Sequence, residues 1–485
     1  MFQVPEQDFS LIIYGASGSL AKLKIFPAIY QLAMEGRLAN VDYRVIGFAR
    51  SEMSNEEFRS LFRQSVVEAL KDIDEGVMTA LLQNVYYLAG DYADRQSFLR
   101  LNELLVQIEP DQKRVRIAYF SVPPSVFPDI VRNGADLFDT DAGLMRLVLE
   151  KPFGYDLASA QELERLLMEF YQEEQLYLLD HYLGKEAVFN VLSLRYANAI
   201  LTTLIKGSHV LNIQITGFEP LGIEGRASYF DNVGICRDMI QSHLFQILAF
   251  LTMSLPAEIN MDSVRRGKRH VFEDLKIVDL KDSVARGQYE AGLIAGEKVP
   301  GYLEEQGVPK ESKTETFTAL KLYIDNLQWH GVPIYLRSGK RMKAKSTAIV
   351  IEFKQHELQR GSFAELETNK LVIQLQPNEM IEFKLFTKMG GTEIAFSELN
   401  TGRPIYCSGD CLHEHGRLLL EAIRGNRLLF LSFEEIYAAW RVIDPVITAF
   451  KENIVPLEKY MAGTTGPKGA DDLLARDGYC WHDYF

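Results

Sequence analysis

The first third of the chain alternates short apolar runs with segments of helical periodicity. The apolar runs lie at 9–15, 43–50, 85–91, 115–123, 144–154 and 175–184. Between them, segments such as 56–70 and 159–174 repeat apolar residues three and four positions apart, which is the spacing of an amphipathic helix. Strands that alternate with helices in this way predict a parallel sheet covered by helices on both faces.

After about residue 190 the pattern changes. The run at 209–222 starts with strict alternation, in which Asn212, Gln214 and Thr216 separate apolar residues. Such alternation is typical of a half-exposed strand in an antiparallel sheet. Further strands are expected at 315–326, 346–354 and 369–377, and a buried helix at 238–253. This part of the chain therefore predicts an α+β domain with a mainly antiparallel sheet.

The length of the chain requires more than one domain. Single hydrophobic cores stop growing near ~250–300 residues, and this chain has 485. We expect an N-terminal domain of Rossmann type at 1–180 and a larger α+β domain at 181–485. The fold class is thus α/β followed by α+β.

A glycine motif follows the first predicted strand directly. Residues 14–24 read YGASGSLAKLK, with Gly15 and Gly18 at the opening of a helix. Glycine lets the backbone turn tightly and approach a pyrophosphate, which binds the free N–H groups at the helix start. A plain strand-to-helix turn is the alternative, but the position after a first strand favours a dinucleotide site.

The end of the second predicted strand indicates which dinucleotide is preferred. Sites for NAD usually place an acidic residue there, to bind the ribose hydroxyls. Here the strand ends on Arg50, and no acidic residue occurs before Glu52. A guanidinium suits a 2′-phosphate, so NADP is favoured, with NAD possible as a second cofactor. The alternative is a solvated loop arginine.

Charge and cysteine content exclude some classes of protein. Lys and Arg total 52 against 66 Asp and Glu, a net charge of −14, which argues against binding to nucleic acid or anionic membranes. Four cysteines are too few for a disulfide framework, and no run approaches ~18 apolar residues. The N-terminus also lacks the features of a signal peptide. We expect a cytoplasmic protein.

The sequence LLDHYLGKE, at 178–186, places four polar side chains at the end of an apolar strand. Ligands of open α/β sheets bind beyond the carboxyl ends of the strands. His181, Tyr182 and Lys185 could hold a phosphate there, while Asp180 could orient a histidine base. His243, in the predicted buried helix, is a candidate for that base, although a lone histidine in such a helix is more often a core residue.

Several motifs in this order resemble the glucose-6-phosphate dehydrogenase family. They are GASGSLA (15–21), EKPFG (150–154), DHYLGKE (180–186), RDMIQSHLFQ (237–246), RGQY (286–289), SKTETF (312–317), GVPIYLRSGKRM (331–342) and GTTGPKGADDLL (463–474). The resemblance covers nearly the whole chain. It implies oxidation of glucose 6-phosphate at C1 with transfer of a hydride to NADP, in the oxidative pentose phosphate pathway, and a homodimer or homotetramer formed through the antiparallel sheet.

The resemblance also implies a role for individual residues. The catalytic residues would be His243 as the base, Asp180 as the carboxylate that orients it, and Lys151 between cofactor and substrate; the bond before Pro152 would be cis. The remaining substrate ligands would be His181, Tyr182, Lys185, Glu219, Asp238, Lys340, Lys345 and His415. The cofactor would be bound by Gly15, Ala16, Ser17, Gly18, Ser19, Leu20, Arg50 and Lys151, and no metal is expected.

Three positions depart from the family pattern. Ser19 replaces an aspartate, Leu178 replaces an arginine, and His415 stands where many members have a tyrosine that reaches the substrate phosphate. These departures leave open a dehydrogenase of a related aldose phosphate, or a catalytically inactive paralogue that binds nucleotide and sugar phosphate.

Two other clusters of charged or metal-ligating residue types lie outside these motifs. The basic run RRGKRH, at 265–270, is expected to be an exposed connector. The run CSGDCLHEH, at 407–415, has tighter spacing than usual zinc sites, so a structural metal is not expected there.

Overall fold

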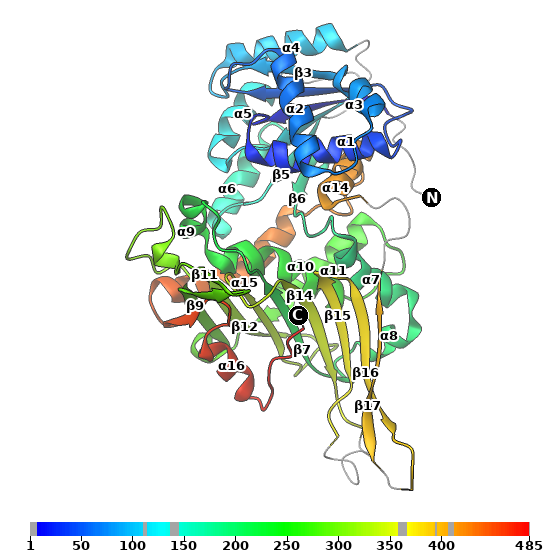
Figure 1. Cartoon of the computed structure of the whole chain (residues 1–485), viewed down its shortest axis with the longest axis vertical. Coiled ribbons are helices and arrows are strands. Elements are labelled where there is room, and N and C mark those ends of the chain that lie inside the picture. The colour runs from blue at the N-terminus through cyan, green and yellow to red at the C-terminus, as the bar shows by residue number, and fades with distance from the viewer. Residues whose placement is uncertain are drawn as a thin grey trace. The chain divides into compact units, whose positions relative to one another are not determined.

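The computed structural model describes residues 7–109, 114–135, 145–356, 366–392, 395–405 and 412–484. The chain forms two compact units, each with its own large sheet (Figure 1). The first unit consists of Met1–Glu186, Asn260–Arg265 and Ser408–Ile436, and the second of Ala187–Ile259, Arg266–Cys407 and Tyr437–Phe485. We expected one boundary, after residue 180. The first unit is larger than the predicted domain at 1–180, because later segments of the chain return to it. One of these segments contains α14 (Glu414–Arg424), which packs on α1 (Phe26–Met34).

The sheet of the first unit has six strands in the order β3-β2-β1-β4-β5-β6, and every neighbouring pair is parallel. Its strands are β1 (Phe9–Tyr14), β2 (Tyr43–Ala49), β3 (Val85–Ala89), β4 (Val115–Phe120), β5 (Arg146–Glu150) and β6 (Leu176–Leu179). The predicted Rossmann-type sheet is confirmed. Chain order reverses between β1 and β4, which is where dinucleotides bind in such folds.

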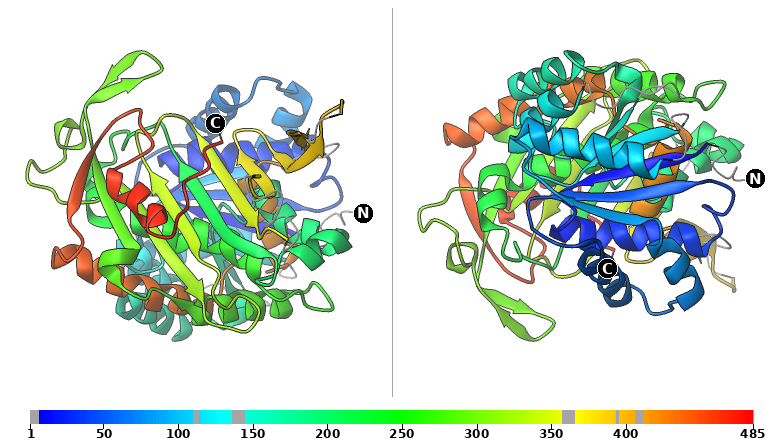
Figure 2. Two further views of the ribbon diagram at one scale, coloured as in Figure 1. Left: turned by 90° about the horizontal axis from the view of Figure 1, so that it is seen from below. Right: turned by 90° about the horizontal axis from the view of Figure 1, so that it is seen from above.

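Helices cover both faces of this sheet (Figure 2). Polar side chains mark where they start: Ser54 and Glu57 form a capping box at α2 (Asn55–Ala69), and Asp94 caps α4 (Arg95–Ile108). Each such cap stabilises its helix by about 1 kcal/mol. The remaining helical segments of this part of the chain are η1 (Ala21–Ile25), α3 (Glu75–Leu82), η2 (Pro124–Val126), α5 (Phe127–Gly134), α6 (Leu157–Met168) and η4 (Glu173–Gln175).

The large sheet of the second unit runs in the order β17-β16-β15-β14-β7-β13-β12-β9-β18, with β8 paired to β12. Most pairs are antiparallel, as predicted, while β13–β7 and β18–β9 are parallel. The strands are β7 (Val210–Phe218), β8 (Leu275–Lys276), β9 (Val284–Glu290), β12 (Phe317–Ile324), β13 (Ile334–Gly339), β14 (Ser346–Phe353), β15 (Lys370–Gln376), β16 (Met380–Lys388), β17 (Phe396–Pro404) and β18 (Leu457–Met461), with β10 (Gly292–Ile294) and β11 (Glu297–Val299) as a separate hairpin.

The prediction that β7 is half exposed was wrong. Asn212, Gln214 and Thr216 are all buried. The C-terminal segment crosses this face of the sheet (Figure 2), where Gln214 Nε2 donates to the carbonyl of Cys480 (3.0 Å) and Gln214 Oε1 accepts from the N–H of His482 (2.9 Å). The alternation therefore marks a strand buried on both faces, with one of its polar side chains, Gln214, bonded to a segment about 266 positions away.

The buried helix predicted at 238–253 is present in two parts. They are η5 (Cys236–Leu244) and α10 (Phe245–Thr252), and the N–H of Phe245 bonds to the carbonyl of Ile240 five residues back, which is π-helical geometry. The other helical segments are α7 (Glu186–Ala197), α8 (Ala199–Leu204), α9 (Ala227–Ile235), α12 (Leu280–Ser283), η6 (Tyr302–Glu304), α15 (Phe433–Lys451) and α16 (Lys468–Ala475). No helix among the described residues is both long enough and apolar enough to cross a bilayer.

The basic run at 265–270 is not an exposed connector, so that prediction was wrong. It lies within α11 (Met261–Asp274), where Arg265 and Lys268 are buried. Lys268 Nζ donates to Gln246 Oε1 at 3.1 Å. Residues three apart share a helix face, so one face of this basic segment is turned inward.

Candidate active site

The loop between β1 and η1 turns at Gly15 and Gly18. Gly15 has φ of +80°, and a Cβ there would lie 2.7 Å from Val122 Cγ1 and 3.0 Å from the carbonyl carbon of Ser121, so only glycine fits. Its N–H donates to the carbonyl of Phe48 (2.9 Å), and the N–H of Gly18 donates to the carbonyl of Gly15 (2.8 Å). This tight turn leads into a helix start, as a pyrophosphate site requires. The predicted loop is completed by Ala16, Ser17, Ser19 and Leu20.

Arg50 follows β2 and is exposed. The hydroxyl of Ser51 donates to that of Ser17 at 3.2 Å, so the end of β2 lies against the glycine loop. This places Arg50 beside the segment that would bind the pyrophosphate, where a guanidinium suits a 2′-phosphate. Together the loop and Arg50 fit NADP.

Arg50→Ala is expected to impair the use of NADP far more than that of NAD. One charge-assisted hydrogen bond contributes ~1.5–3 kcal/mol, which is roughly a ten- to hundredfold change in preference. The measurement is kcat/KM for both cofactors in both proteins. Arg63→Ala serves as a control because Arg63 pairs with Glu75 on the surface (2.6 Å). Equal losses for NADP and NAD would mean that Arg50 does not contact the 2′-phosphate.

Lys151 stands at the carboxyl end of β5. The Lys151–Pro152 peptide bond is cis, as the family resemblance implied. The preceding residue, Glu150, accepts a hydrogen bond from the hydroxyl of Tyr119 at 2.6 Å. Burial raises the pKa of the Glu150 carboxyl, while neighbouring positive charges and this hydrogen bond act in the opposite direction.

The segment after β6 forms a compact turn. Asp180, only 1% exposed, accepts the N–H of Tyr182 on its Oδ1 at 2.9 Å. The Nζ of Lys185 lies 3.5 Å from the centroid of the Tyr182 ring. A Cβ on Gly184 would lie 2.5 Å from the carbonyl oxygen of Glu414, so the turn sits directly on the start of α14. The turn brings together the residues predicted to hold a phosphate.

His415 lies in the first turn of α14, beside the turn at 180–185. We name this turn the phosphate turn after its predicted role. Its ring stacks on that of His181 with centroids 6.2 Å apart and an interplanar angle of 14°. Its Nε2 is 3.7 Å from Glu150 Oε1, and its Nδ1 is 3.8 Å from Glu414 Oε1. The neighbouring His415 ring and the Lys24 charge hold the pKa of Glu414 well below its usual range. Both ring nitrogens therefore face carboxylates.

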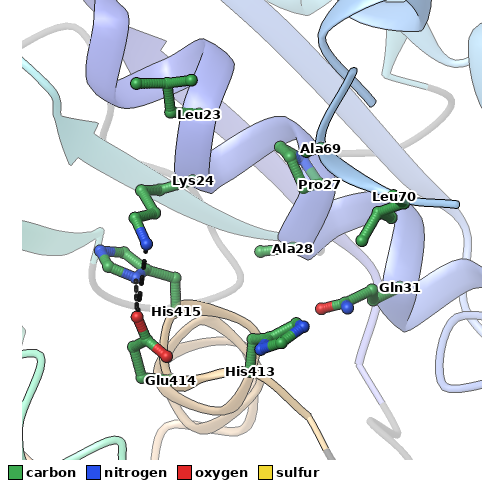
Figure 3. A pocket seen from close by; sticks show the side chains of 10 residues that line it. All are labelled: Leu23, Lys24, Pro27, Ala28, Gln31, Ala69, Leu70, His413, Glu414 and His415. Atoms are coloured by element: carbon green, nitrogen blue, oxygen red, sulfur yellow. Dashed lines mark hydrogen bonds and ion pairs between the residues drawn. The ribbon is translucent and has the colours of Figure 1, made fainter. Parts of the chain in front are cut away.

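A small cavity lies between the start of α14 and α1, beside His415 (Figure 3). Its volume is about 200 Å³. Lys24 reaches from η1 to Glu414, with 3.5 Å between Nζ and Oε1. The surroundings of His415 thus include two carboxylates and the ammonium group of Lys24.

Asp238 and His243 lie on η5 in the second unit. His243 is 1% exposed, which is the burial expected of a base shielded from water. The hydroxyl of Ser242 donates to the carbonyl of Asp238 at 2.8 Å, within the helix. Asp238 and His243 are five positions apart and both belong to this π-helical segment.

A second group of predicted substrate ligands lies at the ends of β7 and β13. Lys340 is 3% exposed, and its Nζ is 2.5 Å from Glu219 Oε2. The hydroxyl of Tyr460 donates to the carbonyl of Lys340 at 2.7 Å. Lys345 is exposed. Glu219 and Lys340 are thus brought together, and Lys345 is not part of the pair.

Glu150 and Glu414 are two site residues that we did not predict from sequence. Glu150 was visible as the first residue of EKPFG, and Glu414 as the neighbour of His415. The sequence alone does not show that both carboxylates face the imidazole of His415, because β5 and α14 are far apart along the chain.

The expected absence of a metal at 407–415 stays a prediction. Cys407 and Cys411 lie outside the described residues. The two described cysteines, Cys236 and Cys480, are free thiols.

A parallel sheet of Rossmann order, a glycine loop at its switch point and a buried histidine in a second domain define a dinucleotide-dependent oxidoreductase. Two family models match the chain: "Glucose-6-phosphate dehydrogenase, NAD binding domain" over residues 12–190, and "Glucose-6-phosphate dehydrogenase, C-terminal domain" over residues 192–482. The chain belongs to the glucose-6-phosphate dehydrogenase family.

Individual relatives agree over the full length. The chain is 38% identical to glucose-6-phosphate 1-dehydrogenase of Dickeya dadantii (strain 3937), with 98% of each chain covered. A solved glucose-6-phosphate dehydrogenase in complex with its substrate glucose 6-phosphate is 32% identical, with a TM-score of 0.89 and 100% of both chains covered. The enzyme from Mycobacterium avium is 30% identical, with a TM-score of 0.84 and 99% of both chains covered. The predicted family, fold class and enzyme class are confirmed.

Proposed function

We propose that this protein oxidises glucose 6-phosphate at C1 to 6-phosphogluconolactone, with NADP as the preferred hydride acceptor. The observation that carries the proposal is the likeness, over the whole of both chains, to an enzyme solved with glucose 6-phosphate. The motifs that carry the family resemblance are also retained here, including DHYLGKE and RDMIQSH.

In the proposed mechanism, His243 takes the proton of the C1 hydroxyl. Bound NADP supplies the acceptor for the hydride that leaves C1. One proton and one hydride leave the sugar, so that C1 becomes the carbonyl carbon of a lactone. Asp180 fixes the tautomer of His243, because a carboxylate that accepts one ring N–H leaves the other nitrogen free to accept a proton.

The substrate would be held at both ends. We assign its phosphate to the turn formed by His181, Tyr182 and Lys185, and its reacting end to Lys151 and His243. The fixed ion pair between Glu219 and Lys340 supports a role in binding the sugar hydroxyls. The other assigned ligands of the hydroxyls are Asp238 and Lys345.

The test uses the purified protein with glucose 6-phosphate and either NADP or NAD. We expect reduced nicotinamide to form, faster with NADP at equal concentration. A faster reaction with another aldose phosphate would favour the alternative that Ser19 and His415 raise. Binding of nucleotide and sugar phosphate without turnover would indicate an inactive paralogue.

The third departure, Leu178, is buried in β6 beside Leu149, where it contributes to packing.

His415 is expected to contribute to the binding of the substrate phosphate, because its ring stacks on that of His181 in the phosphate turn. His415→Ala should therefore raise KM for glucose 6-phosphate. The charged neighbours Glu150, Glu414 and Lys24 are unchanged in this comparison.

The measurement is KM for glucose 6-phosphate in both proteins at saturating cofactor. An unchanged KM in His415→Ala would place His415 outside the phosphate site.

We also propose a homodimer or homotetramer in the cytoplasm, on the family resemblance. Light scattering coupled to size-exclusion chromatography would measure the mass against the 55.2 kDa of one chain. A single monomeric peak at working concentration would contradict the oligomer.

A further inference from the structure

The segment SKTETF, at 312–317, has no role in the proposed mechanism, yet it binds the end of α9. The hydroxyl of Thr314 donates to the carbonyl of Asp231 at 2.6 Å, and the hydroxyl of Ser312 donates to the Asp231 carboxylate. The hydroxyl of Tyr302 donates to the same carboxylate at 2.8 Å. The segment is therefore fixed to α9 just before η5 begins.

Glu315 bonds to the last residue of α9 through its main chain and to the first residue of η5 through its side chain. Its carbonyl accepts the N–H of Ile235 at 3.1 Å. Its Oε1 accepts the N–H of Cys236, the first residue of η5, at 3.3 Å. The side chain is buried, with 6% exposure. One residue thus satisfies two consecutive N–H groups at the start of the helix.

The chain makes room for this carboxylate with a glycine. Gly234 has φ of +70°, and a Cβ there would lie 2.6 Å from Glu315 Cδ. Any larger residue would push the carboxylate away from Cys236. The kink between α9 and η5 is therefore shaped around the side chain of Glu315.

The next residue, Thr316, connects the same segment to Lys340. The carbonyl of Thr316 accepts the N–H of Lys340 at 2.9 Å. The hydroxyl of Tyr460 lies 2.9 Å from Thr316 Oγ1 and donates to the carbonyl of Lys340. Two adjacent residues thus bind two of the elements of the second unit that carry proposed site residues, which are η5 and the end of β13.

We propose that Glu315 is a positioning residue for the reaction, because it fixes the start of η5 and thereby the placement of Asp238 and His243. The proposal rests on the function proposed above for His243. Glu315 itself acts only through the main chain of η5.

The reach of the side chain matters more here than its charge. Burial raises the pKa of the Glu315 carboxyl, while hydrogen bonds from the backbone and the nearby Arg237 and Arg286 act in the opposite direction. The hydrogen bond from the N–H of Cys236 needs an oxygen within reach and does not need a negative charge, so a neutral acceptor of the same length would still accept it. Glutamine has that length, and aspartate is one methylene shorter.

The experiment compares Glu315→Ala, Glu315→Asp and Glu315→Gln. We expect kcat to fall roughly ten- to hundredfold in the alanine and aspartate variants, since displacing a catalytic group by about 1 Å costs up to ~10²-fold. Glu315→Gln should stay within a few-fold of the unmodified protein. KM for NADP should not change, since the glycine loop belongs to the other unit.

The matched control is Glu352→Ala, which removes a buried carboxylate bonded to Asn212 on β7. Amide hydrogen exchange gives a readout that does not need activity: exchange at 235–238 should be faster in Glu315→Ala but unchanged in the control. Should the alanine variant not fold, the comparison of aspartate with glutamine still decides.

Three results would overturn the proposal. They are a kcat within twofold of normal in Glu315→Asp, an equal loss of kcat in Glu352→Ala, and unchanged exchange at 235–238 in Glu315→Ala. Absence of turnover in the unmodified protein would instead contradict the proposed function, and hydrogen exchange would still report whether Glu315 holds the helix.

Discussion

Replacement of His243 by asparagine is expected to lower kcat by at least ~10², and by as much as ~10⁴, with a modest change in KM for glucose 6-phosphate. Removing a general base typically costs this much, because the proton of the C1 hydroxyl then has no positioned acceptor. His243 is buried on η5, so water is poorly placed to replace it. Asparagine is smaller than histidine and polar, and it keeps the helix intact.

Steady-state kinetics over a range of substrate concentrations separates kcat from KM in this variant. His330→Asn provides a control, because it makes the same chemical change at an exposed position of the second unit. A value of kcat near that of the unmodified protein in His243→Asn would eliminate the proposed mechanism.

Local sequence patterns predicted the first unit well. The six predicted strands all form, and their parallel order follows from the helices between them. The glycine loop at Gly15 was also predictable, because a positive φ and a close backbone approach leave glycine as the fitting residue. These features depend on residues that are near each other in the sequence.

Features set by distant segments were not predictable. β7 looked half exposed because polar residues alternate along it. Its polar face is in fact covered by the C-terminal segment around Cys480 and His482, and no local pattern shows this. Likewise, the pairing of His415 with Glu150 depends on α14 returning to the first unit. The sequence DMIQSHLFQ likewise does not show that the first N–H of η5, on Cys236, bonds to Glu315 in another part of the chain.

Asp180→Asn is expected to give the second-largest loss, a fall in kcat of ~10² or more. When an aspartate behind a catalytic histidine becomes asparagine, the histidine adopts the wrong tautomer, and kcat falls by up to ~10⁴. The structure shows why binding should survive this change. Asp180 Oδ1 accepts the N–H of Tyr182, and an asparagine oxygen can accept the same hydrogen bond. The phosphate turn should therefore keep its shape.

Comparison with Asp180→Ala separates the two roles of this carboxylate. Alanine removes the acceptor for Tyr182 as well as the charge, so KM for glucose 6-phosphate should rise in addition to the fall in kcat. In Asp180→Asn, only kcat should change strongly. The measurement is kcat and KM for both variants at saturating NADP. If Asp180→Asn instead raised KM as much as Asp180→Ala and left kcat intact, Asp180 would serve the phosphate turn alone, and the orientation of His243 would have to come from another residue.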